Sequence, residues 1–353
     1  MASLGSTPSS PPLQDPPTVP TDAMSAPPVA TSNPYRDGHT LSLFVTATYP
    51  PWQGLVSAQL TVRILRAFPI TMSPTMIVQL PSGGHAVLKM FDRRFGPQSR
   101  CRGNRPIPHT TQDEARWASF VASSHSQHVL QDIDRQRTTG NFPPSAGDLY
   151  EDAVNDGNPN CPPHCVFEAA VHDQAQRYFR TEVQAYQQLA SLQGATVPRL
   201  YASISHQISS LLGPSASARP EFQAQGILIE LINGLSGERL LNNAREYAVA
   251  DLARIAQNAI DGAAAINNYG VLLGDCQPQN VIIRNSDGRV FYIDFSQAYF
   301  LGPHGLGRDA FWTSVRCNGN FAVMAEALAE KAREVHRADI ASQLQFPGGP
   351  FSR

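Results

Sequence analysis

The sequence predicts an α+β fold in two parts, a small antiparallel sheet followed by a mostly helical region. The first observation is a run of three segments rich in Val, Ile and Leu, at 60–67, 75–80 and 86–91, separated by turn residues. The second is the helical spacing of apolar residues later in the chain, above all over 244–267. The third is the composition, because 42% hydrophobic residues over 353 positions suffice for a packed core.

The first residues differ from the rest of the chain. Residues 1–38 are rich in Pro, Ser and Thr and have almost no aliphatic periodicity. Such a stretch buries too little apolar area to offset its ordering entropy, so we expect a disordered tail. We expect order to begin near Leu41. Residues 39–232 then form the first part of the fold, and residues 233–353 form the mostly helical second part.

An insertion interrupts the first part. The strands expected at 75–80 and 86–91 form a hairpin, because Ser82-Gly83-Gly84 between them is a strong turn signal. Residues 95–165 are polar and carry Pro, Asn, Gly and Asp. We interpret them as an insertion with patchy order and one modest helical pattern over 113–133.

A stronger helix follows the insertion, over 166–192, and Gly194 and Pro198 end it. Its apolar positions are spaced by three and four. The later elements are expected in this order: a strand pair at 199–205 and 226–232, the helix 244–267, a hairpin at 281–284 and 290–293 and a last helix at 322–336. Asn285-Ser286-Asp287-Gly288 supplies the turn of that hairpin.

Charge and cysteine content exclude several classes of function. The net charge is −2 and no block of like charges occurs, so nothing favours a nucleic-acid or acidic-membrane partner. Apolar stretches are too short for a membrane helix, and we expect no secretory signal. The five cysteines are scattered, which is typical of reduced thiols. We therefore expect an intracellular protein, in the cytoplasm.

The strongest chemical signal is the segment Gly274-Asp275-Cys276-Gln277-Pro278-Gln279-Asn280, followed one hairpin later by Ile293-Asp294-Phe295-Ser296. The hairpin is expected to bring Asn280 back towards Asp294, which would offer Mg²⁺ an amide oxygen and a carboxylate oxygen beside substrate phosphates. Asp275 is placed to accept a proton from an incoming hydroxyl. The structural alternative is an acidic turn that only flanks a hairpin.

These motifs resemble the protein-kinase-like superfamily. The form Gly-Asp-x-x-Pro-x-Asn looks closer to aminoglycoside phosphotransferases and divergent fungal kinase-like proteins than to ordinary protein kinases. The resemblance implies a two-lobed fold, with a small antiparallel β N-lobe and a helical C-lobe. It makes Asp275 the catalytic aspartate, and Asn280 and Asp294 the metal ligands. It also implies ATP and Mg²⁺ as cofactors and a hydroxyl of a protein or small molecule as the phosphoryl acceptor.

The same resemblance assigns roles to residues upstream. In Val87-Leu88-Lys89-Met90, Lys89 resembles the strand lysine that holds the α- and β-phosphates, and Glu182 resembles its helix glutamate partner. We expect the Lys89 ammonium within salt-bridge reach of Glu182. By the same resemblance, the Glu230 carbonyl and the Ile232 amide bind adenine. The alternatives are a strand lysine that reaches to solvent and a solvated helix carboxylate.

Several positions depart from the pattern. The turn at 68–74 carries no glycine, so phosphate binding is assigned to Ser73, Thr71 or main-chain amides. Leu273 and Gln277 stand where protein kinases usually have histidine and lysine. These departures favour one alternative, a pseudokinase with little turnover. A second alternative is an ATP-binding scaffold whose insertion and proline-rich tail recruit partners. Two other sites stay open, a metal site at Cys161-Pro162-Pro163-His164-Cys165 and a redox role for Cys276.

Overall fold

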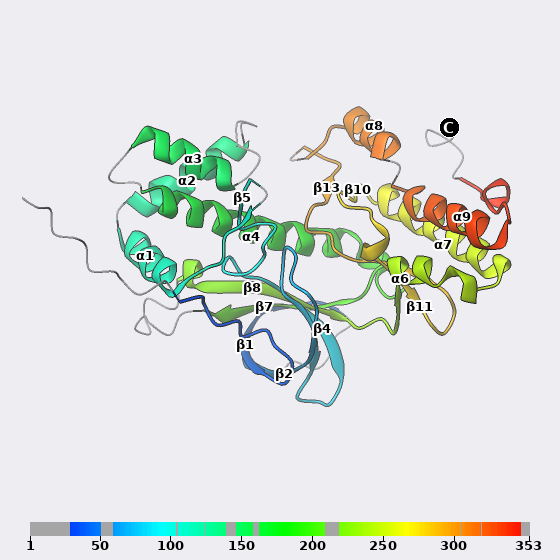
Figure 1. The fold of residues 1–353 in the computed structure, drawn as a ribbon, viewed down its shortest axis with the longest axis horizontal. Helices are drawn as coiled ribbons and strands as arrows, with labels where there is room; N and C mark the ends of the chain where they lie inside the picture. The colour runs from blue at the N-terminus through cyan, green and yellow to red at the C-terminus, as the bar shows by residue number, and fades with distance from the viewer. Residues whose placement is uncertain are drawn as a thin grey trace, which may run out of the picture.

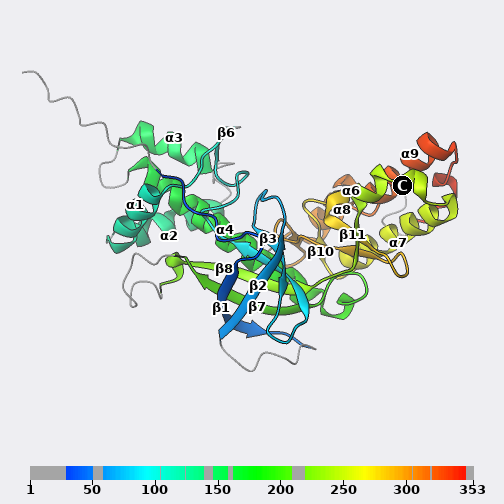
Figure 2. The same ribbon diagram turned by 60° about the horizontal axis from the view of Figure 1, so that its bottom comes forward.

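The computed structural model describes residues 29–50, 59–103, 105–123, 125–138, 146–157, 162–208, 219–303, 305–318 and 320–346. The fold mixes helices and sheet, which confirms the α+β class in its general form. Figure 1 shows helices α1 to α3 gathered at one end of the molecule, and α6, α7 and α9 at the other. Helix α4 extends from the first group towards the second, alongside the sheet (Figures 1 and 2).

Six antiparallel strands form one closed sheet in the order β1-β2-β3-β4-β8-β7. Their bounds are Thr40–Thr48 for β1, Gln59–Ala67 for β2, Thr75–Gln79 for β3, His85–Phe91 for β4, Leu200–Gln207 for β7 and Gln223–Glu230 for β8. Phe44 of β1 faces Ser205 of β7 where the sheet closes. The sequence analysis missed β1, so it predicted neither the sixth strand nor the closure.

The interior of the closed sheet is a core of its own. Alternate residues of each strand point inward, as the period of a strand requires. The fully buried members include Leu43, Ile64, Val78, Leu88 and Ile204. Because β4 has a partner on both sides, its residue Lys89 is held between Thr75 of β3 and Ile227 of β8.

The expected tail ends earlier than position 38. Residues 1–28 lie outside the described residues, but Ala30 already forms a bridge with Thr110. The ring of Tyr35 is buried, and its hydroxyl donates a hydrogen bond to Asp92 at 2.7 Å. A single buried aromatic side chain thus ties down a stretch whose composition alone suggested disorder.

The described part of the insertion is a packed helical group, with three helices where the sequence predicted one. Its helices are α1 Thr111–Ala122, α2 His125–Thr138 and α3 Ala146–Asp156, and its short strands are β5 Cys101–Arg102 and β6 Arg105–Pro106. They pack on the first half of α4, Pro163–Gln188, around a core that contains Trp117, Phe120 and Phe167. Helix α1 begins with a capping box between Thr110 and Asp113.

The last third of the chain forms the second helical group. Its helices are α6 Gly237–Asn242, α7 Val249–Asn268, α8 Arg308–Asn318 and α9 Val323–His336. Its strands are β9 Gly234–Ser236, β10 Val271–Leu272, β11 Val281–Arg284, β12 Val290–Tyr292 and β13 Tyr299–Phe300. The predicted hairpin is present as β11 and β12, with β9 added beside β11.

Short 3-10 turns join these elements. They are Ala190–Leu192, Pro220–Phe222, Ala244–Glu246, Pro278–Asn280 and Ala341–Gln343. The helix expected over 244–267 therefore starts at Val249, after a separate turn. In the described part of the chain, none of the helices has the length and apolar character needed to cross a lipid bilayer.

Candidate active site

Lys89 lies at the centre of the candidate site. Its Nζ is 2.6 Å from Oε2 of Glu182 on α4 and 2.8 Å from Oδ1 of Asp294, which follows β12. The side chains of Lys89 and Glu182 are 7% and 1% exposed, whereas that of Asp294 is 28% exposed. The expected ion pair between Lys89 and Glu182 is therefore present, and Asp294 reaches solvent from the same cluster.

The main chain at Asp294 has an unusual conformation. Its φ of 64° lies in the left-handed region, which residues other than glycine rarely adopt. Two contacts oppose the strain. The Ser296 hydroxyl donates to Oδ1 of Asp294 at 2.7 Å, and the buried ring of Phe295 packs edge-on against Tyr186 of α4 at 5.2 Å. Ser296 thus holds the carboxylate in place.

The three charges of the cluster shift one another's pKa values. Burial raises the pKa of Glu182 to about 7, against the attraction of Lys89 and with the repulsion of Asp294. Burial opposes the charge on Lys89, yet Asp294 and Glu182 raise its pKa to about 12. Burial also opposes the charge on Asp294, but Lys89 and Ser296 lower its pKa. One ammonium cannot neutralise two carboxylates, so Glu182, the more deeply buried carboxylate, favours its proton.

Asp275 and Asn280 form the second half of the candidate site. The Nδ2 of Asn280 donates to the main-chain oxygen and to Oδ2 of Asp275, each at 3.0 Å. The amide of Ile293 donates to the main-chain oxygen of Asn280 at 3.0 Å. The hairpin of β11 and β12 therefore places Asn280 next to Ile293, the residue before Asp294, as the turn residues of the hairpin predicted.

Gly274 permits the close approach of these two segments. A Cβ at this position would lie 2.1 Å from the main-chain oxygen of Gln297, three residues after Asp294. No side chain fits at that distance, so a glycine directly before Asp275 keeps the two segments in contact.

Sequence analysis missed Asn320, which fixes the segment before Asp275. Its side chain accepts from the Leu273 amide at 2.9 Å and donates to the Leu273 carbonyl at 3.0 Å. Its main-chain oxygen accepts the Cys276 thiol at 3.2 Å. Burial raises the pKa of that thiol to about 12, which disfavours the thiolate that a redox role would need. Asn320 lies in a short polar stretch, where no sequence signal distinguishes it.

The residues assigned to adenine and phosphates are placed as follows. Glu230 ends β8, and its carboxylate pairs with Arg199 at 2.7 Å. Ile232 lies half-buried in the link between β8 and β9. Ser73 is 9% exposed and lines a small internal cavity with Phe91 and Tyr178.

The turn 68–74 packs against the segment that follows Asp294. The Nε2 of Gln297 lies 3.6 Å from Sδ of Met72 at the tip of this turn. Gly96 also packs closely against this turn, since a Cβ there would lie 2.3 Å from the Met72 carbonyl oxygen. This packing explains why Ser73 is buried rather than displayed on an open loop.

The donor set for a cation consists of an amide and a carboxylate. The nitrogen of the Asn280 amide is engaged by Asp275, so the amide oxygen is the atom that could bind a cation. Together with the Asp294 carboxylate, it suits a hard cation that keeps water and phosphate oxygens as further ligands. Within the described residues, no group of three or more His, Cys, Asp and Glu side chains could hold a metal.

The cysteine and histidine motif at 161–165 is only partly described. Cys161 lies outside the described residues, and Cys165 is buried in the first turn of α4.

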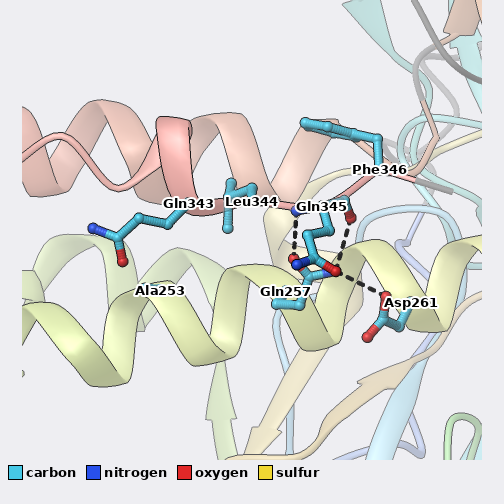
Figure 3. A pocket seen from close by; sticks show the side chains of 7 residues that line it. All are labelled: Ala253, Gln257, Asp261, Gln343, Leu344, Gln345 and Phe346. Carbon is cyan, nitrogen blue, oxygen red and sulfur yellow. Dashed lines mark hydrogen bonds between the residues drawn. The ribbon is translucent and has the colours of Figure 1, made fainter. Parts of the chain in front are cut away.

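Several cavities lie elsewhere on the described part of the molecule, and two of them are of similar size. One, of about 460 Å³, lies between α7 and residues 343–346, where Gln257 bonds Asp261 at 2.9 Å and the main chain of Gln345 at 2.8 Å (Figure 3). The other, of about 450 Å³, borders the turn between β11 and β12 and is lined by Arg254 and Arg284. Neither is lined by Lys89, Asp275 or Asp294.

Comparison with known proteins gave no sequence relative. No protein-family model matches the chain. No curated protein matches it either. Among solved structures, it is similar to the Rio2 kinase of Chaetomium thermophilum, described as an ADP/Mg²⁺-phosphoaspartate complex, with 13% identity and a TM-score of 0.39. The match covers 81% of this chain and 58% of that one, so this chain spans less than two thirds of its length.

Proposed function

We propose that the chain is a phosphotransferase of the protein-kinase-like fold that uses ATP and Mg²⁺ and transfers the γ-phosphate to a hydroxyl of a protein or small molecule. The observation that carries the proposal is the joint contact of Lys89 with Glu182 and Asp294. In this proposal residues 39–232 form the first lobe, with the insertion at 95–165, and residues 233–353 form the second. The nucleotide binds between them.

Each residue of the site has a role that its surroundings support. Lys89 contacts the α- and β-phosphates, because it is a buried cation fixed by two carboxylates. Asn280 and Asp294 would hold Mg²⁺, which neutralises charge on the phosphate oxygens when it is bound.

Asp275 is the proposed general base. The acceptor oxygen forms a bond to the γ-phosphorus, the bond from that phosphorus to the ADP oxygen breaks, and the acceptor proton passes to the Asp275 carboxylate. The hydrogen bond from Asn280 to Oδ2 leaves the other carboxylate oxygen of Asp275 to take this proton.

Adenine and the phosphates need main-chain contacts as well. The Glu230 carbonyl and the Ile232 amide are proposed for adenine, at the link where β8 leaves the closed sheet. Ser73 is proposed for the phosphates, and this assignment requires the turn 68–74 to lift from its contact with Gln297.

One observation favours a second candidate, a kinase-like protein with little or no turnover that acts as an ATP-binding scaffold. Met72 at the tip of the turn 68–74 rests on Gln297, and the turn has no glycine that would let its main chain follow the phosphates. A turn that stays in this position would restrict access to Lys89.

Thermal unfolding with ATP, with and without Mg²⁺, tests the proposal. ATP at 100 times its dissociation constant should stabilise the protein by about 2.7 kcal/mol, and the shift should depend on Mg²⁺. Turnover is then measured with a panel of proteins and small alcohols. Binding without any transfer at high protein concentration would favour the second candidate, and no shift at all would refute both.

A further inference from the structure

Strand β4 and the residues after it contact helix α4 at two distant points. Lys89 pairs with Glu182, and Arg93 pairs with Glu168 at 2.7 Å. Glu168 and Glu182 lie about four turns, or about 21 Å, apart on one uninterrupted helix of 26 residues. Two buried ion pairs therefore fix both the position and the direction of α4 relative to β4.

The second contact belongs to a buried group of four charges, which we call the Arg93 cluster: Arg93, Arg100, Glu114 and Glu168. The Arg100 guanidinium binds both carboxylate oxygens of Glu168, at 2.6 and 3.0 Å. Arg93 also pairs with Glu114. The four side chains are between 1% and 9% exposed, and their formal charges cancel.

The insertion supplies half of this cluster. Arg100 and Glu114 come from the segment 95–165, and the ring of Trp117 on α1 lies 4.8 Å from the Arg93 guanidinium. His109 lies 3.2 Å from the same guanidinium and is joined to Thr31 at 2.7 Å. The insertion and the first described residues thus close around the end of α4 that is far from Lys89.

We propose that the insertion positions Glu182 for its contact with Lys89, by fixing α4 through Arg93, Arg100 and Glu168. The inference rests on the proposed function, in which the Lys89 contact prepares the nucleotide site. Buried charges that separate are left unpaired in a poorly polarisable interior, so the cluster resists any displacement of α4. Because α4 is one rigid helix, a cluster that holds its first half in place also limits the displacement of Glu182 near its other end.

The test measures the Lys89 contact directly, in the protein without nucleotide. An amine-reactive acylating reagent is added, and the rate of modification at Lys89 is followed by mass spectrometry of its peptide. Glu168→Gln removes the negative charge that pairs with both Arg93 and Arg100. We expect modification of Lys89 to become about tenfold faster or more, because breaking one partner of a buried pair is strongly destabilising.

Glu151→Gln is the matched control. Glu151 lies in the insertion and, like Glu168 on α4, pairs with an arginine, Arg102, but both side chains are about half exposed, at 46% and 51%. This variant should leave the rate at Lys89 unchanged, since exposed pairs contribute little. If Glu168→Gln does not fold, Arg100→Lys replaces it, because lysine keeps the charge but loses the two-pronged contact.

The outcomes separate this inference from the proposed function. Faster hydrogen exchange in α1 to α3 with an unchanged rate at Lys89 would overturn the inference, because the cluster would then hold only the insertion. Faster modification of Lys89 together with faster exchange over residues 178–188 would support it. Neither readout uses ATP, so a wild-type protein that fails to bind nucleotide would refute the proposed function and leave this test readable.

Discussion

The Nζ of Lys89 lies 2.8 Å from Oδ1 of Asp294, although 205 positions separate the two residues in the sequence. Glu182 contacts the same ammonium from a third part of the chain. One buried positive charge therefore joins the closed sheet, helix α4 and the segment after β12. Variants of this charge test both the stability and the chemistry of the site.

Replacing Lys89 should destabilise the protein. In Lys89→Met, Glu182 and Asp294 face each other without a cation, which should cost about 3–5 kcal/mol in urea unfolding at pH 8. The loss should be smaller at pH 5, because burial raises the pKa of Glu182 to about 7 and the carboxyl can take up a proton. Lys331→Met breaks a surface pair with Glu334 and serves as the control. Equal losses in the two variants would contradict this account.

The two aspartates should separate binding from transfer. Asp294→Asn should remove the Mg²⁺-dependent part of the thermal shift with ATP, because an amide is a weaker ligand for a hard cation. Asp275→Asn should leave that shift nearly intact and abolish phosphate transfer, because the amide cannot accept the proton. Transfer at the wild-type rate by Asp275→Asn would show that the assigned base is wrong.

Asn320→Ala should slow transfer without weakening nucleotide binding. The variant leaves the buried amide and carbonyl of Leu273 unpaired, at a cost of about 1–3 kcal/mol for each group, and frees the segment that carries Asp275. We expect kcat to fall and the dissociation constant for ATP to stay constant. Asn258→Ala, which removes a hydrogen bond to the Gly288 carbonyl away from the site, should leave kcat unchanged.

Stability should fall with acidification because of His172. Burial, with Arg93 and Arg180, lowers the pKa of this histidine to about 3, and its ring lies against Trp117 at 5.5 Å. Below its ordinary pKa of 6.5 the unfolded chain binds a proton that the folded protein refuses, so its contribution is complete above pH 6.5 and is lost as the pH falls towards 3. Between pH 7 and 5 the wild type should lose about 2 kcal/mol more than His172→Phe. Parallel stability curves for the two proteins would contradict the assignment.

Local signals predicted local structure well. The hairpin of β11 and β12 was predicted because the turn residues between Asn285 and Gly288 lie within the hairpin itself. Strand β1 also carries a local signal, the alternation of Leu41, Leu43 and Val45. The strand was not predicted because it directly follows a polar, proline-rich stretch that was assigned to a disordered tail. The closure of the sheet could not be predicted, because the pairing of two strands far apart in the sequence depends on both segments and cannot be derived from either one alone.

In the candidate site, too, some contacts could be predicted from the sequence and others could not. The contact of Lys89 with Glu182 was expected from the resemblance of the motifs, whereas its contact with Asp294 was not predicted. The Arg93 cluster could not, because charged side chains are expected at the surface and their burial depends on partners from the insertion. Asn320 acts through main-chain groups, and such contacts constrain the residue type too little to be seen in one sequence.

The closed sheet also sets an order of events during folding. Strand β1 needs β7 as a neighbour and β4 needs β8, and both partners come after the whole insertion. Until residue 230 has left the ribosome, β1 and β4 present open edges to other chains. Pairings this far apart in sequence form slowly. A fragment that stops before residue 200 should therefore aggregate, whereas the full chain can seal both edges at once.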